Sequence, residues 1–395
     1  MAEPKIRFKQ DNGSCFPVWK EYSISDLFIK ILAKNKNCEN TNVITNSAEF
    51  GLISQCDYFD KDIAVKGKTD NYTIIQTGDF VYNPRKSSYA PMGPFNCYRL
   101  KEDGIVSPLY SCLRPKGILN PEYLLWYFQT DKWYGYVNDH GAQNGARHDR
   151  VGMTDKILMG IPVTAPCSEE QQKIADFLSS VDEIIATSEQ EVANLEIQKK
   201  AVTKKIFSQE VRFKKDDGSD FPEWEEHVIH DFCKVSSGEF VIKTKQDDSY
   251  PYPVFNGGTE NTGYYSEYNY DGSYILISSR GANAGYVNKY VGRLWCGNSC
   301  YAVRIIDDSI STFEFLYHAC KYHQYDFLSN QQTGSIPAVN KGQMEDFLLL
   351  VPSNFEEQCH IADFLSNFDK AIVSARKELE LWKELKKGLL QQMFC

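Results

Sequence analysis

The 395-residue sequence lacks the short motifs by which many catalytic and cofactor sites are recognised. It contains no GxxxxGK[ST] for nucleotide phosphates, no GxGxxG opening a βαβ unit, no HExxH and no GxSxG. It also lacks the Asn-Pro-Pro-aromatic tetrapeptide of amino-methyltransferases, since YNPRK at residues 82–86 shares only two letters with it. These absences favour a binding protein over an enzyme.

Long apolar runs and paired cysteines are missing as well. No segment approaches the roughly 18 apolar residues that a membrane-spanning helix needs, and MAEPKIRFKQ has no apolar stretch behind its charges. The twelve cysteines include no CxxC; Cys296 and Cys300 are the closest pair, without further ligands at zinc-site spacing. We therefore expect a cytoplasmic protein with reduced thiols and no metal site.

What the sequence does have is a globular composition, with 42% hydrophobic and 24% charged residues in a length that suits two or three domains. The net charge of −10, taken alone, argues against nucleic-acid binding. A global charge is misleading where acidic and basic residues are segregated, so their distribution decides.

Basic residues are concentrated in two windows, 80–101 and 272–306, that contain no acidic residue. Each window follows a predicted strand and also holds Gly and Asn, a composition that suits contacts with phosphates and base edges. A solvated basic face would explain any single residue, but explains the paired windows less well. The predicted DNA-contacting residues here are Arg85, Lys86, Arg99, Arg280, Asn283, Lys289 and Arg293.

A second candidate segment follows later in each half. HGAQNGARHDR at residues 140–150 and NQQTGSIPAVNKGQ at residues 330–343 are Gly-bearing loops whose side chains match base-edge donors and acceptors. A histidine alone carries little weight here, because a lone histidine is more often structural. The candidates in these loops are Gln143, Asn144, Arg147, His148, Gln332 and Lys341.

Two blocks of the sequence occur twice. Residues 6–28 align with 211–233 at an offset of 205, with 12 of 23 positions identical. Residues 168–182 align with 355–369 at an offset of 187, with 10 of 15 identical. Between these blocks the two halves barely resemble each other, so we expect two different modules held in one repeated frame.

Each later block begins a long predicted helix with apolar residues on a heptad grid. About forty residues at 1.5 Å each span about 60 Å, and a continuous apolar stripe of that length needs a partner. The other copy is the obvious partner, and antiparallel packing fits a pseudo-twofold arrangement with one module at each end. The predicted packing residues are Ile174, Leu178, Val181, Ile185, Val192, Leu195, Ile361, Leu365, Phe368, Ile372, Leu379 and Trp382.

Lys199 and Lys386 occupy the same polar slot in the two apolar stripes. One interpretation is that each stem packs against the partner helix while the ammonium group reaches solvent. The sharper alternative is that the lysines fix the register of the two helices.

Inside the modules the pattern is mixed α/β. Residues 72–83 and 272–281 predict strands followed by turns, because they are β-branched and bounded by Gly, Asn and Asp. Residues 120–137 and 311–328 predict aromatic-rich amphipathic helices. Their N-cap candidates are Asn120, Ser311 and Thr312.

The doubled starts NGSCFPVW and DGSDFPEW, together with IPVTAPCSEEQQKIADFLSSVD and VPSNFEEQCHIADFLSNFD, carry a family resemblance. With two dissimilar modules between them, they resemble the specificity subunit of type I restriction-modification systems over the whole chain. The resemblance implies an α+β fold in which two long antiparallel helices, forming a coiled coil, join two α/β target-recognition domains. The expected domains are residues 1–167 and 211–353, and the expected helices are residues 168–210 and 354–395.

The resemblance also implies a function. Each domain would read one half of a bipartite, asymmetric target in double-stranded DNA, and the helices would act as a ruler and as the docking surface for two methyltransferase subunits. Restriction subunits would join outside them. S-adenosylmethionine would bind the methyltransferase partners, so this chain would hold no cofactor, metal or catalytic residue.

Two other readings stay open at this point. A solitary DNA-modifying enzyme or nuclease on a duplicated scaffold would act on DNA without partners. A coiled-coil adaptor of protein complexes would have no nucleic-acid role, but it leaves the two basic windows unexplained.

Overall fold

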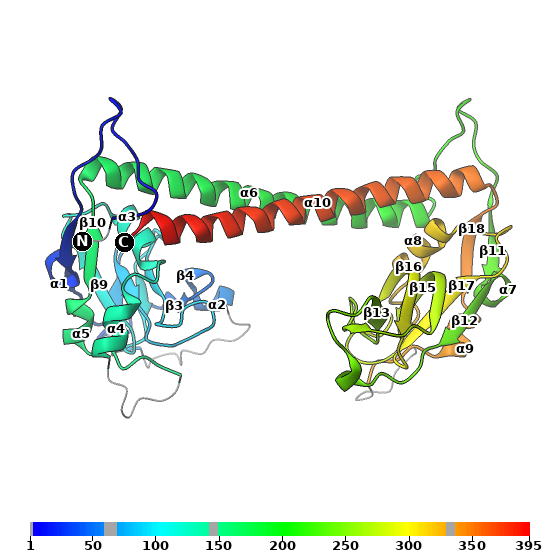
Figure 1. The fold of residues 1–395 in the computed structure, drawn as a ribbon, viewed down its shortest axis with the longest axis horizontal. Coiled ribbons are helices and arrows are strands. Elements are labelled where there is room, and N and C mark those ends of the chain that lie inside the picture. The colour runs from blue at the N-terminus through cyan, green and yellow to red at the C-terminus, as the bar shows by residue number, and fades with distance from the viewer. Residues whose placement is uncertain (1–2, 59–68, 142–148, 329–335) are drawn as a thin grey trace. The chain divides into compact units, whose positions relative to one another are not determined.

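The computed structural model of the protein describes residues 3–58, 69–141, 149–328 and 336–395. Its contacts divide the chain into two compact units, Met1–Glu189 with Glu378–Cys395, and Gln190–Lys377. The two long helices are α6 (Ser168–Phe207) and α10 (Phe355–Met393) (Figure 1). Each unit therefore combines one module with parts of both helices. The predicted domain boundaries separate modules from helices instead.

The module of the first unit is built from short strands and helices. Its strands are β1 (Lys20–Ser23), β2 (Phe28–Lys30), β3 (Val43–Ser47), β4 (Gly51–Ser54), β5 (Thr73–Ile75), β6 (Phe80–Tyr82), β7 (Phe95–Cys97), β8 (Gly104–Val106), β9 (Ser111–Pro115) and β10 (Pro162–Ala165). Its helices are α1 (Ile24–Leu27), α2 (Gln55–Tyr58), α3 (Pro121–Phe128), α4 (Tyr134–His140) and α5 (Asp155–Gly160). The strands form sheets in the orders β2-β9-β6-β7 and β4-β3-β8-β5, and a β1-β10 pair.

The module of the second unit has longer strands. They are β11 (Trp224–Val228), β12 (Cys233–Ser237), β13 (Tyr252–Phe255), β14 (Tyr264–Tyr265), β15 (Tyr270–Ser278), β16 (Val287–Cys296), β17 (Cys300–Ile305) and β18 (Leu348–Pro352). The helices are α7 (Ile229–Phe232), a 3-10 turn η1 (Lys243–Lys245), α8 (Phe313–Tyr322) and α9 (Lys341–Glu345). One sheet has the order β12-β17-β15-β16-β13-β14, and β11 pairs with β18.

The two modules share a sheet core although residues 29–167 and 234–354, which carry most of it, do not align in sequence. The antiparallel order β2-β9-β6-β7 of the first unit matches the antiparallel order β12-β17-β15-β16 of the second. The β1-β10 and β11-β18 pairs are likewise equivalent and antiparallel. Alternation of apolar residues sets a strand's buried face without specifying its neighbours, so this likeness emerges only from the pairing.

The two aromatic-rich helices differ in extent from their predictions. Asn120 caps α3 by accepting from the Glu122 amide at 2.8 Å, as predicted, and Thr312, the second of two alternatives, caps α8. The prediction of a single helix over residues 120–137 was wrong, because α3 ends at Phe128. There the buried Trp133 indole donates to the Phe128 carbonyl at 3.3 Å, which satisfies a helix-end carbonyl and seats the ring in the core.

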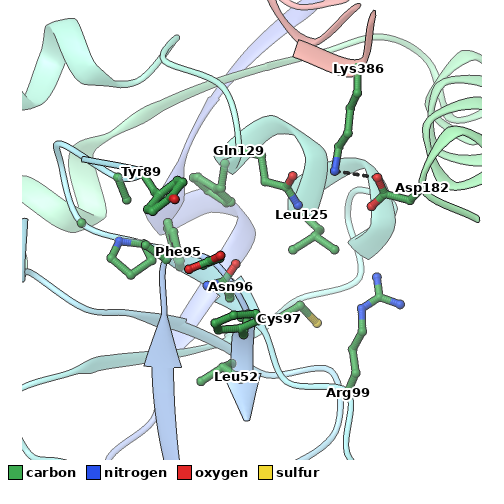
Figure 2. A pocket seen from close by; sticks show the side chains of 18 of the residues that line it. Leu52, Tyr89, Phe95, Asn96, Cys97, Arg99, Leu125, Gln129, Asp182 and Lys386 are labelled. Atoms are coloured by element: carbon green, nitrogen blue, oxygen red, sulfur yellow. Dashed lines mark ion pairs between the residues drawn. The ribbon is translucent and has the colours of Figure 1, made fainter. Parts of the chain in front are cut away.

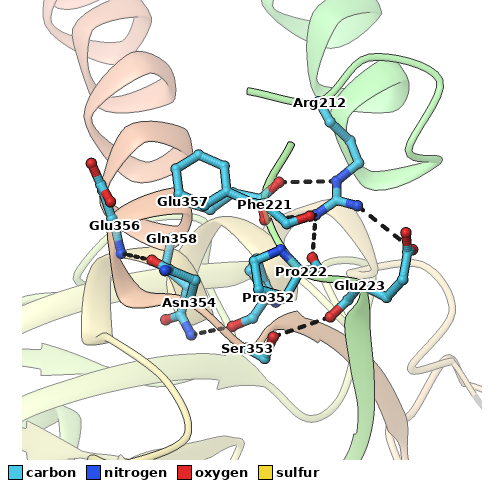
Figure 3. A network of polar contacts seen from close by, with 10 residues as sticks. All are labelled: Arg212, Phe221, Pro222, Glu223, Pro352, Ser353, Asn354, Glu356, Glu357 and Gln358. Carbon is cyan, nitrogen blue, oxygen red and sulfur yellow. Dashed lines mark hydrogen bonds and ion pairs between the residues drawn. The ribbon is translucent and has the colours of Figure 1, made fainter. Parts of the chain in front are cut away.

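The repeated sequence blocks clasp each other within each unit. In the second unit, the Arg212 guanidinium donates to both carboxylate oxygens of Glu357, at 3.1 and 2.9 Å, and to the Phe221 carbonyl at 3.3 Å (Figure 3). Glu357 is fully buried, and its hydrogen bonds hold the pKa of Arg212 above the ordinary value. In the first unit, Arg7 binds the buried Glu170 in the same bidentate way, at 2.9 Å twice.

A buried glutamine after each of these glutamates ties the helix start to its module. Gln358 donates to the carbonyls of Pro352 and Ile310 and accepts from the Thr312 amide, all between 2.8 and 2.9 Å. Gln171 makes the equivalent contact with the Asn120 amide at 2.8 Å. The repeated Glu-Glu-Gln motif is therefore a fastening between helix and module, which explains why it occurs twice.

The two long helices are antiparallel in each unit. In the first unit, Lys386 binds Asp182 at 2.6 Å and Lys383 binds Glu189 at 2.9 Å. As the residue number rises along α6, the number of its partner in α10 therefore falls. The predicted packing residues are buried or half-buried: Ile174, Leu178, Val181, Ile185, Val192, Leu195, Ile361, Leu365, Phe368, Ile372, Leu379 and Trp382.

The second unit repeats this pairing. Lys199 of α6 forms an ion pair with Asp369 of α10, and Glu196 forms one with Arg376. The structure thus favours the register-fixing interpretation of Lys199 and Lys386, because both bind the equivalent aspartate of the opposite helix.

Candidate nucleic-acid interface

In the first unit, an isolated β-bridge joins Arg85 to Arg150. The Lys86 amide donates to the Asp149 carbonyl at 2.9 Å, and the Val151 amide closes the other side of the bridge at 2.8 Å. The bridge brings the start of the first basic window against the end of the predicted glycine loop. We call this surface, residues 84–88 with 149–151, the first ledge.

A ladder of amide side chains supports the first ledge from below. Asn83 is buried at the end of β6, where its side chain accepts from the Arg85 amide at 3.0 Å and donates to the Asn46 carbonyl at 3.1 Å. Asn46 in turn donates to the Val81 carbonyl at 2.7 Å. Because the Arg85 amide donates to a buried side chain, the backbone at Arg85 is held in place.

Gly93 is required next to this ladder. Its φ is +83°, and a Cβ atom would lie 2.1 Å from the Asn83 carbonyl oxygen. Any side chain at this position would push apart the strand end that carries Arg85.

A cavity of about 430 Å³ opens beside the first ledge. Arg85, Lys86 and Arg150 contribute cations to its lining, and Asn46 and Tyr110 contribute polar groups. Burial raises the pKa of the Tyr110 hydroxyl, which therefore stays protonated and able to donate. Glu49 also lines the cavity, and the Asp149 carboxylate lies 3.8 Å from both Arg85 and Arg150, so three cationic side chains face two carboxylates at this surface. Such a mixture suits phosphate oxygens and base edges.

The second unit has an equivalent bridge between Arg280 and Ala338. The Gly281 amide donates to the Pro337 carbonyl at 3.0 Å, and the Val339 amide closes the bridge at 2.9 Å. We call residues 279–283 with 337–339 the second ledge. Arg280 and Asn283 are both exposed on it.

The two ledges occupy the same place in the shared sheet order. Arg85 follows β6 and Arg280 follows β15, the third strand of each matched set. The segments that bridge to them belong to the predicted glycine loops, with Arg150 at the end of residues 140–150 and Ala338 inside residues 330–343. Sequence reasoning proposed both segments in each half but did not predict that they pair.

Arg99 lies at a different surface from Arg85. It forms an ion pair with Glu122 and lines a second cavity of about 410 Å³, whose lining also includes Asp182 of α6 and Lys386 of α10 (Figure 2). Tyr89 lines both cavities, so they adjoin.

The remaining basic candidates of the second unit are occupied by acidic partners. Lys289 forms an ion pair with Glu314 and lies 4.4 Å from the centre of the Tyr317 ring. Arg293 binds Asp271 at 3.1 Å.

Lys341 lies 3.4 Å from Glu345 within α9. The structure does not place Lys289, Arg293 or Lys341 in the bridge, and their role in DNA contact stays a prediction. The candidates Gln143, Asn144, Arg147, His148 and Gln332 lie outside the described residues.

Sequence reasoning missed the supporting residues of the ledges. Asn46, Asn83 and Asn96 form one hydrogen-bonded set, with Asn96 donating to the Asn46 side chain at 2.7 Å. The available signal was the occurrence of Asn in or beside apolar strand segments, where a buried amide needs a partner.

In the part of the chain that the structure describes, no group of three or more His, Cys, Asp or Glu residues could hold a metal ion. No described helix is long and apolar enough to cross a membrane.

Comparison with known proteins gives one consistent family. The model of the type I restriction modification DNA specificity domain matches residues 17–197 and 222–381. The chain is 29% identical over 147 residues to the type I restriction enzyme EcoprrI specificity subunit of Escherichia coli, covering 36% of this chain and 35% of that protein. It is 28% identical over 210 residues to the type I restriction enzyme MjaVIII specificity subunit of Methanocaldococcus jannaschii, covering 48% and 46%. The chain spans about a third of the first relative and about half of the second.

Solved structures resemble the whole chain. The S subunit of the type I restriction-modification system from M. genitalium aligns with a TM-score of 0.61 at 16% identity, covering 100% of this chain and 99% of that one. A chain from a structural study of assembly and conformational transition of the type I restriction-modification system aligns with a TM-score of 0.60, also at 16% identity, covering 96% and 98%. At this identity the likeness shows the fold, two domains joined by long helices.

Proposed function

Because the chain belongs to the type I restriction-modification DNA specificity family, we propose that it is the subunit that recognises the DNA sequence for such a system. One observation carries the proposal: each unit presents an exposed arginine on a bridged ledge, at the same place in the same strand order. Phosphate contacts position a protein on DNA, and side chains around them read the bases.

The two ledges differ in composition, which supports an asymmetric target. Arg85 is followed by Lys-Ser-Ser, whereas Arg280 is followed by Gly-Ala-Asn. Different donors and acceptors at equivalent positions read different bases. Each unit therefore reads its own half-site, and an unspecified spacer separates the two.

The partners of the chain are two methyltransferase subunits that dock on the long helices, with restriction subunits outside them. The helices expose apolar side chains that suit a protein partner, among them Ile197, Val373, Leu381 and Leu385. S-adenosylmethionine binds the methyltransferase subunits, which flip the target adenine out of the duplex. This division of labour agrees with a sequence that has no recognisable catalytic motif.

The test is co-expression with the cognate methyltransferase, followed by mapping of methylated adenines on the host genome. The expected result is one bipartite, asymmetric sequence with a fixed spacer. Methylation without a common sequence would contradict the proposal.

The purified chain alone separates this function from a solitary enzyme. Supplied with S-adenosylmethionine and magnesium, it should neither methylate nor cut DNA until the methyltransferase is added. Modification or cleavage by the chain alone would favour the enzyme on a duplicated scaffold. Absence of any DNA shift with the partner present would favour an adaptor.

A further inference from the structure

The internal repeat raises a question of partner choice in the long helices. α6 and α10 carry nearly the same apolar stripe, so α6 of one molecule could pair with α6 of another, and α10 with α10. A twofold pair of identical helices is the commonest way in which such a surface associates. The apolar stripe discriminates against it only through side-chain size, because each predicted packing position is apolar in both helices and Ile174, Leu178 and Ile185 are repeated unchanged.

Two kinds of ion pair cross the helix interface. The first kind, Asp182 with Lys386 and Lys199 with Asp369, is identical in both halves of the repeat, since the offset of 187 converts one pair into the other. Two copies of α6 in the same register would also place Asp182 opposite Lys199. These pairs fix register and are neutral toward partner choice.

The second kind of ion pair is reversed in charge between the halves. Glu189 binds Lys383 in the first unit, at 2.9 Å, and Glu196 binds Arg376 in the second. At the offset of 187, the residue equivalent to Glu189 is Arg376, and the residue equivalent to Glu196 is Lys383. Each equivalent residue therefore carries the opposite charge.

We infer that these charge-reversed pairs, Glu189–Lys383 and Glu196–Arg376, select the pairing of α6 with α10 over the pairing of either helix with its own copy. Two copies of α6 in the same register would place Glu189 opposite Glu196 twice. Two copies of α10 would place Arg376 opposite Lys383 twice. Charges that flank an apolar helix seam set partner choice in this way, by penalising the wrong pair as well as favouring the right one. The inference concerns assembly and holds whether or not the chain reads DNA.

The size of the preference follows from the number of contacts. Each exposed charge contact between the two helices changes an association constant about twofold, in either direction. Converting one pair of α6 copies and one pair of α10 copies into two α6–α10 pairs replaces four like-charge contacts by four opposite-charge contacts. The combined preference is on the order of a hundredfold at low ionic strength, and salt weakens it.

The experiment uses the full chain, cleaved after folding. A protease site inserted between Gln209 and Glu210 lies in the turn after α6 and leaves Arg212 on the same fragment as Glu357, just as Arg7 and Glu170 share the other fragment. The cleaved protein is denatured, refolded at low ionic strength, and its fragment pairs are counted by native mass spectrometry. The wild type should return almost entirely as the pair of one N-terminal and one C-terminal fragment.

A charge-swapped variant isolates the electrostatic contribution. E189K/K383E keeps every α6–α10 contact attractive, so the chain still folds, but makes contacts between two α6 or two α10 copies attractive too. The preference for the mixed pair should fall by on the order of a hundredfold. The matched control E189K/K383E/E196K/R376E restores like charges in both wrong pairs and should restore the wild-type result. A double variant that returns only mixed pairs, as the wild type does, overturns the inference.

A second measurement, on the intact chain, tests the same charge pairs if the cleaved fragments fail to refold. Glu189→Lys and Lys383→Glu should each lower the melting temperature, and the double variant should recover most of the loss. Additive losses without recovery would mean that the pair does not contribute, and would overturn the inference as well.

Discussion

Arg85 and Arg280 have the same backbone setting and different supports. Asn83 holds the turn before Arg85 through its buried side chain, whereas Ser279 makes two backbone hydrogen bonds, to Ser299 and Val339, beside Arg280. Both solutions fix the backbone and leave the guanidinium exposed. An arginine presented this way meets a phosphate without first ordering a loop.

We predict that Arg85→Ala and Arg280→Ala each weaken DNA binding by the protein in complex with its methyltransferase. A plot of the logarithm of the binding constant against the logarithm of salt concentration has a negative slope. Each substitution should make that slope less steep by about one. Fluorescence anisotropy across a salt series measures both quantities. The conservative variant Arg85→Lys keeps the charge and should keep the slope. Wild-type affinity and slope in both alanine variants would place the DNA on another surface.

His318 is a buried residue whose titration should be visible in stability. Its Nε2 lies 3.1 Å from the Ser366 hydroxyl of α10, and burial, with the nearby Lys199, lowers its pKa to about 3. Between pH 6.5 and 3 the unfolded chain therefore binds more protons than the folded one at this site. Acidification through that window destabilises the fold.

The prediction for His318 is a loss of about 2 kcal/mol of unfolding free energy from this residue alone between pH 7 and pH 5. His318→Gln can keep a hydrogen bond to Ser366 but has no proton to gain, so its loss over this range should be smaller by that amount. Denaturant unfolding of both proteins at the two pH values measures the difference. Equal losses would show that His318 does not titrate with unfolding.

At the scale of elements, the start of α10 is fastened at several points. Asn354 accepts from the Glu356 amide at 2.7 Å, Gln358 reaches the module, and Glu357 holds Arg212 (Figure 3). A buried charge pair adds little stability as a whole, but loss of one partner leaves an uncompensated charge. The clasp therefore specifies where the helix begins more than it adds to the total stability.

We predict that Glu357→Ala lowers the unfolding free energy by about 3–5 kcal/mol, because Arg212 loses its bidentate partner in a site that is mostly buried. The matched double variant Arg212→Met with Glu357→Leu should lose less, since it leaves no unpaired charge. Chemical denaturation compares the two proteins. A single variant as stable as the double variant would contradict a charge-based clasp.

At the scale of the whole molecule, the function proposed for the long helices is to fix the spacing of the two half-sites. Inserting one heptad into both helices, after Glu189 in α6 and after Lys377 in α10, keeps the apolar stripe and adds about 10 Å of helix. Because half-sites on one face of a duplex recur about every 10 base pairs, the wild-type spacer should no longer be accepted. Methylation of a library of spacer lengths measures this.

A second insertion variant, in which the apolar stripe is not kept, serves as the comparison. A four-residue insertion in α6 alone, between Glu189 and Lys199, shifts the stripe against α10 and should change the accepted spacer or prevent assembly. Recognition of the original target by both insertion variants would contradict the ruler function.

The sequence alone predicts the features that repeat or follow a period. The offsets of 205 and 187, the heptad stripe, the cap at Asn120 and the choice of Ser311 or Thr312 for the second cap are local patterns. They predict two mixed α/β modules and two antiparallel helices, and the α+β class came from the family resemblance. The basic windows and glycine loops were also visible, because their composition is local. Helix ends were less certain: Trp133 terminates α3 through a core contact that helical periodicity does not record.

The tertiary structure alone decided which of those segments meet. Arg85 pairs with Arg150 and Arg280 with Ala338 across more than fifty residues, and the two modules share a strand order without shared sequence outside the repeated blocks. It also revealed that Glu189 faces Lys383. Pairing between distant segments depends on packing and hydrogen bonds made after the chain folds, and a local residue pattern specifies the faces of an element without specifying its neighbour.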